Sequence, residues 1–190
     1  MYAIGYFLDD ICYASHLAAA DKIGVNPEIN LIVLSLCEFI GIVFGNWILP
    51  NTPRIKGEVI ALLCIALLNF GAGFIQIPII CNQCSAGYFQ LALIAFSRVF
   101  LAVENSYWYI LGLELFPVSI RTIGTGISSG WGTLGGFTLQ NITVISFENN
   151  INILWVFAVA FLGKALVVSF IPETFNQPNR DQIDEVKEKL

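Results

Sequence analysis

A short polar segment, Glu114–Arg121, separates two long apolar stretches at residues 88–112 and 122–147. Because an α-helix rises about 1.5 Å per residue, about 20 apolar residues are enough to cross the hydrocarbon core of a bilayer. Pro117 cannot continue a helix, and its ring disfavours helical geometry at the residue before it. The sequence therefore predicts a tight polar turn between two membrane helices. The charged ends of this turn are expected to pair with each other or with neighbouring loops.

The composition points to a membrane protein. Hydrophobic residues make up 56% of the chain and charged residues 12%, whereas soluble domains have roughly 25% charged residues. The net charge of -5 argues against nucleic acid as a partner, because nucleic acid attracts basic surfaces. No catalytic constellation or phosphate-binding loop appears, so we expect neither an enzyme nor a cofactor. Cys81 and Cys84 form a lone C-x-x-C pair, and zinc would need two further ligands, so we expect no metal.

Six apolar stretches follow one another along the chain, separated by polar or proline-containing segments. They lie at residues 1–18, 30–49, 58–77, 88–112, 122–147 and 153–171. The first is short and carries Asp9 and Asp10, and we interpret it as the later part of a longer helix. The expected fold is an all-α membrane protein with about six transmembrane helices in the lipid bilayer, formed by residues 1–172.

Basic residues are distributed unevenly over the connecting segments. With six spans, one side of the membrane receives Arg54, Lys56, Arg121 and the three basic residues of the tail, whereas the other side receives Lys22. Lys and Arg accumulate on the cytoplasmic side of membrane proteins. We therefore predict a multi-pass membrane protein with a cytoplasmic C-terminus and with the Cys81 loop outside. The plasma membrane is the expected location.

Residues 173–190 form a charged tail with a pattern of its own. Ile183, Val186 and Leu190 recur at helical spacing, and Glu185 and Lys189 are an i,i+4 pair. This pattern predicts a short amphipathic helix that lies against the cytoplasmic loops. A frayed, solvated tail is the alternative, because isolated short helices are marginally stable in water.

Two motifs near the helix ends connect the chain with a known family. The residues that carry them are Glu114, Leu115, Phe116, Pro117 and Arg121, and then Pro172, Glu173, Thr174 and Pro178. Over nearly its whole length the chain resembles the C-terminal half of major facilitator superfamily transporters, in particular the organic cation, anion and zwitterion transporters. Glu38 and Arg98 match charged positions in that family. Nothing in the chain corresponds to the family's first six helices.

The resemblance implies one half of a twelve-helix bundle that carries a small organic solute, an organic ion or zwitterion, by alternating access. The implied partner is the missing N-terminal six-helix half or another subunit. Sugar porters of the same superfamily carry similar motifs, so a sugar-porter-like carrier remains an alternative. A truncated, non-transporting membrane protein or an incomplete gene model is the other.

Charged residues inside the apolar stretches are costly in hydrocarbon and usually pair within the bundle. Arg98 and Glu38 lie near the middle of different stretches, whereas Glu104 is six residues from Arg98 and points to a different face. We therefore predict an Arg98–Glu38 pair, either as part of a substrate cavity or as a structural ion pair. Lys164 is expected to extend toward the interface or to pair locally. The acidic residues of the first stretch are further cavity candidates.

The stretch at residues 122–147 is rich in glycine. Its glycines are Gly124, Gly126, Gly130, Gly132, Gly135 and Gly136. The G-x-x-x-G spacings at 126–130 and 132–136 predict close helix packing or a helix that bends during transport. The resemblance makes Thr133 a substrate-selecting position, acidic in cation transporters and Arg in anion transporters; a neutral Thr leaves the solute's charge open. Tyr107 and Trp131 would give the cavity aromatic surfaces suited to organic cations, with simple packing as the alternative.

Overall fold

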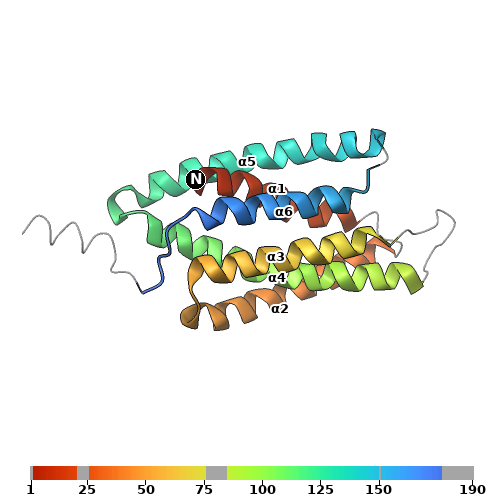
Figure 1. Ribbon diagram of the computed structural model, residues 1–190, viewed down its shortest axis with the longest axis horizontal. Helices are drawn as coiled ribbons and strands as arrows, with labels where there is room; N and C mark the ends of the chain where they lie inside the picture. Colours follow the sequence, from red (N-terminus) through yellow and green to blue (C-terminus); the bar gives the residue numbers. More distant parts are fainter. Residues whose placement is uncertain (1, 21–25, 76–84, 150, 177–190) are drawn as a thin grey trace, which may run out of the picture.

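The computed structural model describes residues 2–20, 26–75, 85–149 and 151–176, and within these ranges it does not describe the side chains of 15–20 and 147. The regular structure of these residues is entirely helical. It consists of α1 (Tyr2–Ala20), α2 (Pro27–Ile48), the 3-10 helix η1 (Leu49–Asn51), α3 (Arg54–Gly73), α4 (Ser85–Leu115), α5 (Val118–Glu148) and α6 (Ile153–Ser169). Consecutive α-helices run in opposite directions along one bundle, so α2, α4 and α6 end where α1, α3 and α5 begin (Figure 1).

Three of the helical segments are long and apolar enough, by length and composition, to cross a membrane: Pro27–Asn51, Arg54–Gly73 and Ser85–Leu115. α6 is apolar but has only 17 residues. α1 carries two adjacent aspartates and α5 is rich in glycine and hydroxyl residues, which lowers the mean hydropathy of both. The all-helical fold expected from the sequence is therefore confirmed, its three long apolar helices fit a membrane protein, and six crossings remain a prediction.

α2 begins three residues earlier than the sequence predicted, at Pro27. The Asn26 side chain accepts a hydrogen bond from the Glu28 amide at 3.4 Å, and proline fits the first helical turn because that turn needs no amide donor. The polar segment at 114–121 is also mostly helical. Only Phe116 and Pro117 interrupt the path from α4 to α5.

α3 begins at Arg54, whereas the sequence predicted a loop as far as residue 57. The cause is a contact distant in sequence. The carboxylate of Glu173 accepts hydrogen bonds from the amides of Arg54 at 2.8 Å and Ile55 at 3.2 Å. A carboxylate at a helix N-terminus satisfies free amides and opposes the helix dipole, so this end is stabilised from outside its own segment.

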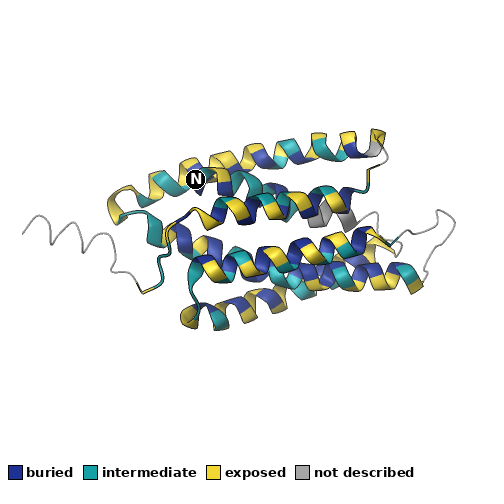
Figure 2. Cartoon of the chain, viewed as in Figure 1, coloured by how far each residue is buried: buried dark blue, intermediate teal, exposed yellow. Residues whose placement is uncertain are grey.

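α3 lies at the centre of the bundle and packs against both α4 and α6, while α2 packs on α4 and α1 packs on α5 and α6. The core between them contains large buried side chains from several helices, among them Leu62, Trp108, Phe157 and Phe161. Exposed positions run along α2 and α5, on two outer sides of the bundle (Figure 2). Many of these exposed side chains are large and apolar, including Phe39, Trp47 and Phe137, as expected where a bilayer or another membrane protein covers them.

Glycines allow two close helix contacts. On α5, a Cβ at Gly135 would lie 2.1 Å from the Phe7 carbonyl oxygen of α1, and one at Gly132 would lie 2.7 Å from an Asp10 carboxylate oxygen. At Gly126, Gly130 and Gly136 a Cβ would meet nothing within 4 Å. The predicted close packing of α5 is therefore present, but its two G-x-x-x-G spacings are not the contact surface, because the contacting glycines are three residues apart.

A second glycine contact lies where the sequence did not predict one. On α2, a Cβ at Gly41 would lie 2.5 Å from the Val99 carbonyl oxygen of α4, and one at Gly45 would lie 3.1 Å from the Val103 Cα. These two glycines have G-x-x-x-G spacing, and their missing side chains bring the α2 and α4 backbones together. The same contact places the acidic and basic residues of α2 and α4 side by side.

Several predicted features fall outside the described residues. These are the loop with Cys81 and Cys84, Lys22, and the tail from residue 177 onward with its predicted amphipathic helix. The division into a bundle at 1–172 and a tail at 173–190 stays a prediction. Within the described part, Glu173 and Thr174 contact the bundle.

Candidate functional site

Arg98, near the middle of α4, forms an ion pair with Glu38 of α2. Its Nη2 lies 2.8 Å from Glu38 Oε2, and its Nη1 donates to the Tyr13 carbonyl oxygen of α1 at 3.2 Å. The Tyr13 hydroxyl in turn donates to Glu38 Oε1, and the guanidinium lies over the Tyr13 ring, 4.5 Å from its centroid. The pair predicted from the sequence is present, and Tyr13 extends it to a third helix.

The two side chains of this ion pair differ in solvent exposure. The Arg98 side chain is 2% exposed, whereas that of Glu38 is 23% exposed. The guanidinium is therefore fixed inside the bundle, while the carboxylate can be reached from one side. An accessible carboxylate backed by a buried cation is an arrangement that a charged solute can perturb. The roles of both residues in substrate binding remain predictions.

Lys164 of α6 is the second buried cation, and it corrects an expectation. The sequence predicted that it would extend toward the interface or pair locally; instead its side chain is 0% exposed and pairs with Asp9 of α1 and Glu104 of α4. Its Nζ also lies 4.7 Å from the centroid of the Trp108 ring. Lys164 lies on the side of α6 that faces the bundle core, so its counter-charges come from other helices.

Glu58, in the second turn of α3, completes this group and was missed in the sequence. Its side chain is fully buried, and both carboxylate oxygens lack a hydrogen-bond partner among the described residues. It interacts electrostatically with Lys164, Glu104 and Asp9. Glu58 follows the basic residues of the 54–57 segment, so the sequence alone favoured a loop-flanking, solvated carboxylate.

A third group of polar residues joins the ends of α3, α4 and α6. Arg54 donates from Nε and Nη2 to Glu114 Oε1, each at 3.3 Å, and the Thr174 hydroxyl donates to Glu114 Oε2. The Arg54 guanidinium lies 5.2 Å from the centroid of the Phe175 ring. We call Arg54, Glu114, Glu173 and Thr174 the end network.

The end network decides between two predicted partners of Glu114. The structure pairs it with Arg54 from a neighbouring segment, whereas Arg121 donates from Nε to the Phe116 carbonyl oxygen at 3.3 Å. Pro117 lies between the two helices that carry these residues. Pro172 follows α6 and lies just before the network residues Glu173 and Thr174. The two family-like motifs thus meet at one end of the bundle.

The remaining cavity candidates lie apart from the Arg98–Glu38 pair. Tyr107 is buried near the same end as the end network, where its hydroxyl bonds to that of Thr52. Trp131 is 51% exposed on α5, and the exposed Thr133 donates its hydroxyl to the Ser129 carbonyl oxygen at 3.2 Å. Both therefore point out of this bundle, so a role in solute binding would require a second surface opposite α5.

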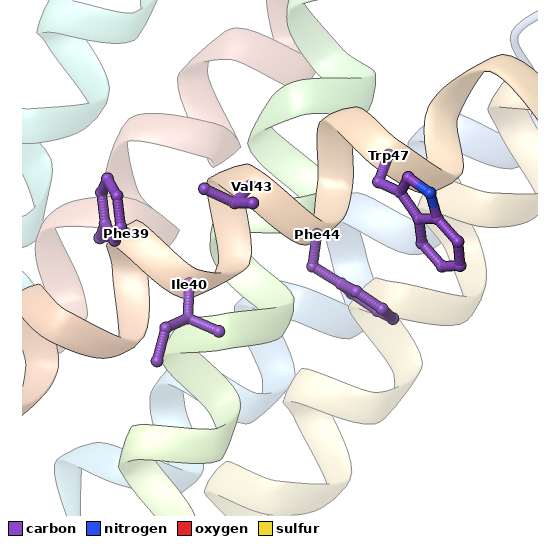
Figure 3. Close-up of a pocket in the computed structure, with 5 residues that line it drawn as sticks. All are labelled: Phe39, Ile40, Val43, Phe44 and Trp47. Atoms are coloured by element: carbon purple, nitrogen blue, oxygen red, sulfur yellow. The ribbon is translucent and has the colours of Figure 1, made fainter.

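A shallow groove of about 380 Å³ runs along α2. It is lined by Phe39, Ile40, Val43, Phe44 and Trp47, all from that one helix (Figure 3). Because the lining is apolar and belongs to an outer face, the groove has the character of a lipid or helix contact. Among the residues that the structure describes, no group of three or more His, Cys, Asp or Glu side chains is placed to hold a metal ion.

Comparison with curated proteins finds distant relatives, several of which are named as solute carriers or transporters. Organic anion transporter 3 of Homo sapiens is 24% identical over a 193-residue alignment that covers 97% of this chain and 33% of the relative. Solute carrier family 22 member 6-A of Xenopus laevis is 29% identical over 101 residues, 53% of this chain and 18% of the relative. Synaptic vesicle 2-related protein of Bos taurus is 25% identical over 156 residues, 81% of this chain and 27% of the relative.

The chain thus spans between 18% and 33% of the length of these relatives. No family model matches it. The names of the relatives are those of a solute carrier, an organic anion transporter and a synaptic vesicle protein. Apolar helices and relatives of this kind together fit a multi-helix membrane protein.

Proposed function

We propose that this chain forms the C-terminal six-helix half of a major facilitator carrier, which moves a small organic ion or zwitterion across a membrane by alternating access. The observation that carries the proposal is the Arg98–Glu38 pair, whose guanidinium is buried near the middle of α4 and bound to α1 through Tyr13. Ionisable groups inside a membrane bundle are costly and commonly mark substrate or ion pathways.

The geometry suits a charged solute. In this superfamily the substrate site lies near the bilayer midplane between two six-helix halves that rock against each other. Glu38 is the reachable member of the pair, and a cationic group could bind its carboxylate directly. An anionic group would instead compete with that carboxylate for Arg98. Because the site offers both charges and Thr133 is neutral, the solute class is organic ion or zwitterion with its sign open.

The end network gives the proposal a second support. Arg54, Glu114 and Thr174 tie three helix ends together through charge-assisted hydrogen bonds. We place this end in the cytoplasm, because it carries the basic segment around Arg54 and Lys56. Contacts of this type hold one half together as a rigid unit during rocking.

We place the N-terminal six-helix half against the exposed apolar faces of α2 and α5. A second six-helix half, or another subunit, would cover these faces and bring Trp131 and Thr133 to the cavity. The plasma membrane is the proposed location. If the chain is instead a non-transporting membrane protein, combining it with an N-terminal six-helix half restores no uptake.

The test is a chimera in which residues 1–176 replace the aligned region of human organic anion transporter 3. Solute uptake is measured in cells with radiolabelled organic anions, cations and zwitterions, and in vesicles that contain the 190-residue chain alone. We expect saturable uptake by the chimera and none by the chain alone. The Arg98→Ala chimera should lose most of this uptake, whereas Arg98→Lys should retain part of it.

Surface expression of each chimera is measured by biotinylation, so that loss of folding is separated from loss of uptake. Lys56→Ala, an exposed cation on α3, is the matched control and should transport normally. Full uptake by Arg98→Ala at equal surface expression would exclude a role of the pair in transport. Saturable uptake by the chain alone would overturn the half-carrier proposal and indicate a homo-oligomer.

A further inference from the structure

The group around Lys164 contains more acid than base. Asp9 of α1 and Glu104 of α4 form ion pairs with the ammonium group of Lys164 on α6, and the buried Glu58 of α3 interacts electrostatically with all three. We call these four residues the buried acid cluster. Fully ionised, three carboxylates and one ammonium would leave two uncompensated negative charges inside the bundle. Such a state is strongly disfavoured, because buried charges need partners to replace water.

Hydrogen bonding shows where the imbalance lies. Lys164 donates to Asp9 Oδ1 and to Glu104 Oε1, so these two carboxylates each have a charged partner. Both oxygens of Glu58 and the second oxygen of Glu104 have none among the described residues. A carboxylate can only accept hydrogen bonds, whereas a protonated carboxyl can also donate one. Glu58 is therefore a fully buried carboxyl group to which no described residue donates a hydrogen bond. Oε2 of Glu104, the carboxylate with which Glu58 interacts, receives none either.

We propose that the buried acid cluster is a proton-binding site, in which Glu58 and Glu104 share one proton next to Lys164. Protonation of Glu58 supplies an O–H that Glu104 Oε2 can accept, and it removes one of the two excess negative charges. The site takes a proton rather than a metal ion, because Lys164 already occupies the centre as a cation. The described residues also hold no group suited to metal binding.

Other titratable groups face the cluster from α1. Cys12 and Asp10 interact electrostatically with Lys164, and Tyr2 interacts with Glu58. None of these three groups is a cation, so none supplies the missing counter-charge. From α4 the further neighbour is Trp108, whose ring faces the Lys164 ammonium. Among the described groups that act on Glu58, Lys164 is the one cation, and a bound proton would neutralise the charge of Glu58 that Lys164 leaves uncompensated.

The cluster lies near one end of the bundle. Glu58 lies four residues, about 6 Å of helix rise, from the start of α3 at Arg54. The end network lies at that end, where Glu173 binds the first amides of α3 and Arg54 binds Glu114. Coupling of the proton to solute rests on the proposed transport function, whereas proton binding does not.

The test measures protonation directly, on the purified 190-residue chain in lipid nanodiscs. Infrared difference spectra recorded during a pH titration report the carbonyl stretch of protonated carboxyl groups. At neutral pH exposed glutamates are ionised, so we expect a protonated-carboxyl band in the wild type that disappears at alkaline pH. Glu58→Gln should remove this band at neutral pH.

Glu104→Gln should also remove the band, because Glu58 would lose the carboxylate that shares its proton and would ionise beside Lys164. Glu28→Gln, an exposed acid at the start of α2, is the matched control and should keep the band. Circular dichroism and gel filtration establish that each variant is folded. If Glu58→Gln is unstable, the wild-type spectrum and Glu104→Gln still decide the matter.

Absence of the band from the wild type at neutral pH would overturn the proposal, as would its persistence in folded Glu58→Gln. Loss in Glu58→Gln but not in Glu104→Gln would also contradict it, because the proton would then belong to one carboxyl alone. These outcomes do not depend on uptake. A chain that binds the proton but fails every transport assay would keep this inference and reject the proposed function.

Discussion

Both buried cations lie against an aromatic ring as well as a carboxylate. Arg98 lies over Tyr13 and beside Glu38, and Lys164 lies near Trp108 and beside Glu104. The face of an aromatic ring attracts a cation without adding a negative charge. Each cation is thus partly compensated by groups that cost little to bury, and each binds three helices together at one point.

The Arg98–Glu38 pair predicts that removing Arg98 alone destabilises the protein more than removing both charges. Arg98→Ala leaves the Glu38 carboxylate without its counter-charge, and breaking a buried pair in this way costs about 3–5 kcal/mol. Combining it with Glu38→Gln should recover part of that loss, because the orphaned charge is then gone. The free energy of unfolding, measured by denaturant titration in mixed micelles, checks both variants.

Lys56→Ala is the control for this prediction. Lys56 is exposed on the first turn of α3, and exposed substitutions usually change stability by less than about 0.5 kcal/mol. Equal losses for Arg98→Ala and for the double variant would show that the two side chains do not compensate each other. The 23% exposure of Glu38 places the expected loss toward the lower part of the range.

Single residues show where sequence reasoning succeeds and where it fails. Arg98 could be matched with Glu38 because both lie near the centres of long apolar stretches, where few opposite charges are available. Lys164 could not be matched with Asp9 and Glu104, because an almost uniformly apolar helix gives no periodicity that says which face is inside. Glu58 was hidden by the basic residues just before it, which suggested water rather than a core.

At the scale of helices, α1 and α5 pack closely because Gly135 has no side chain at their contact. The Phe7 carbonyl oxygen lies where a Cβ at Gly135 would have to be. Adding that methyl group must move one backbone away from the other. In contrast, Gly130 is exposed on the same helix and a Cβ there meets nothing within 4 Å.

Two alanine substitutions on α5 should therefore have opposite effects. Gly135→Ala should destabilise the bundle by about 1–3 kcal/mol, the usual cost of overpacking a close contact. Gly130→Ala should be neutral or stabilise it by up to about 1 kcal/mol, because alanine favours the helix over glycine. Thermal unfolding followed by tryptophan fluorescence compares the two. If both variants behave alike, α1 and α5 do not pack through Gly135.

Helix positions were largely predictable and helix ends were not. Long apolar stretches between prolines and charges indicated the helices. A buried apolar segment must satisfy its own backbone N–H and C=O groups, and an α-helix does so. The start of α3 was misplaced because its capping carboxylate, Glu173, lies 119 residues away in sequence. The contacting glycines were also misassigned, because spacing alone does not say which face of α5 meets α1.

At the scale of the whole molecule, the alternating helix directions bring three basic residues of the described part of the chain to one end. Arg54, Lys56 and Arg121 lie in the first turns of α3 and α5, which begin at the same end of the bundle (Figure 1). The family-like motifs meet there as well, through Glu114 and Thr174. Sidedness can therefore be tested with one residue at each end.

We predict that the Lys56 end faces the cytoplasm and that the Asn149 end, after α5, faces outward, because basic residues near the ends of membrane helices are retained inside. In a cysteine-free background, Lys56→Cys and Asn149→Cys place one exposed thiol at each end. An impermeant maleimide should label Asn149→Cys in intact cells and Lys56→Cys only after permeabilisation. Labelling of both in intact cells would exclude an odd number of crossings between them, and the reverse pattern would place Arg54 and the end network on the outer side.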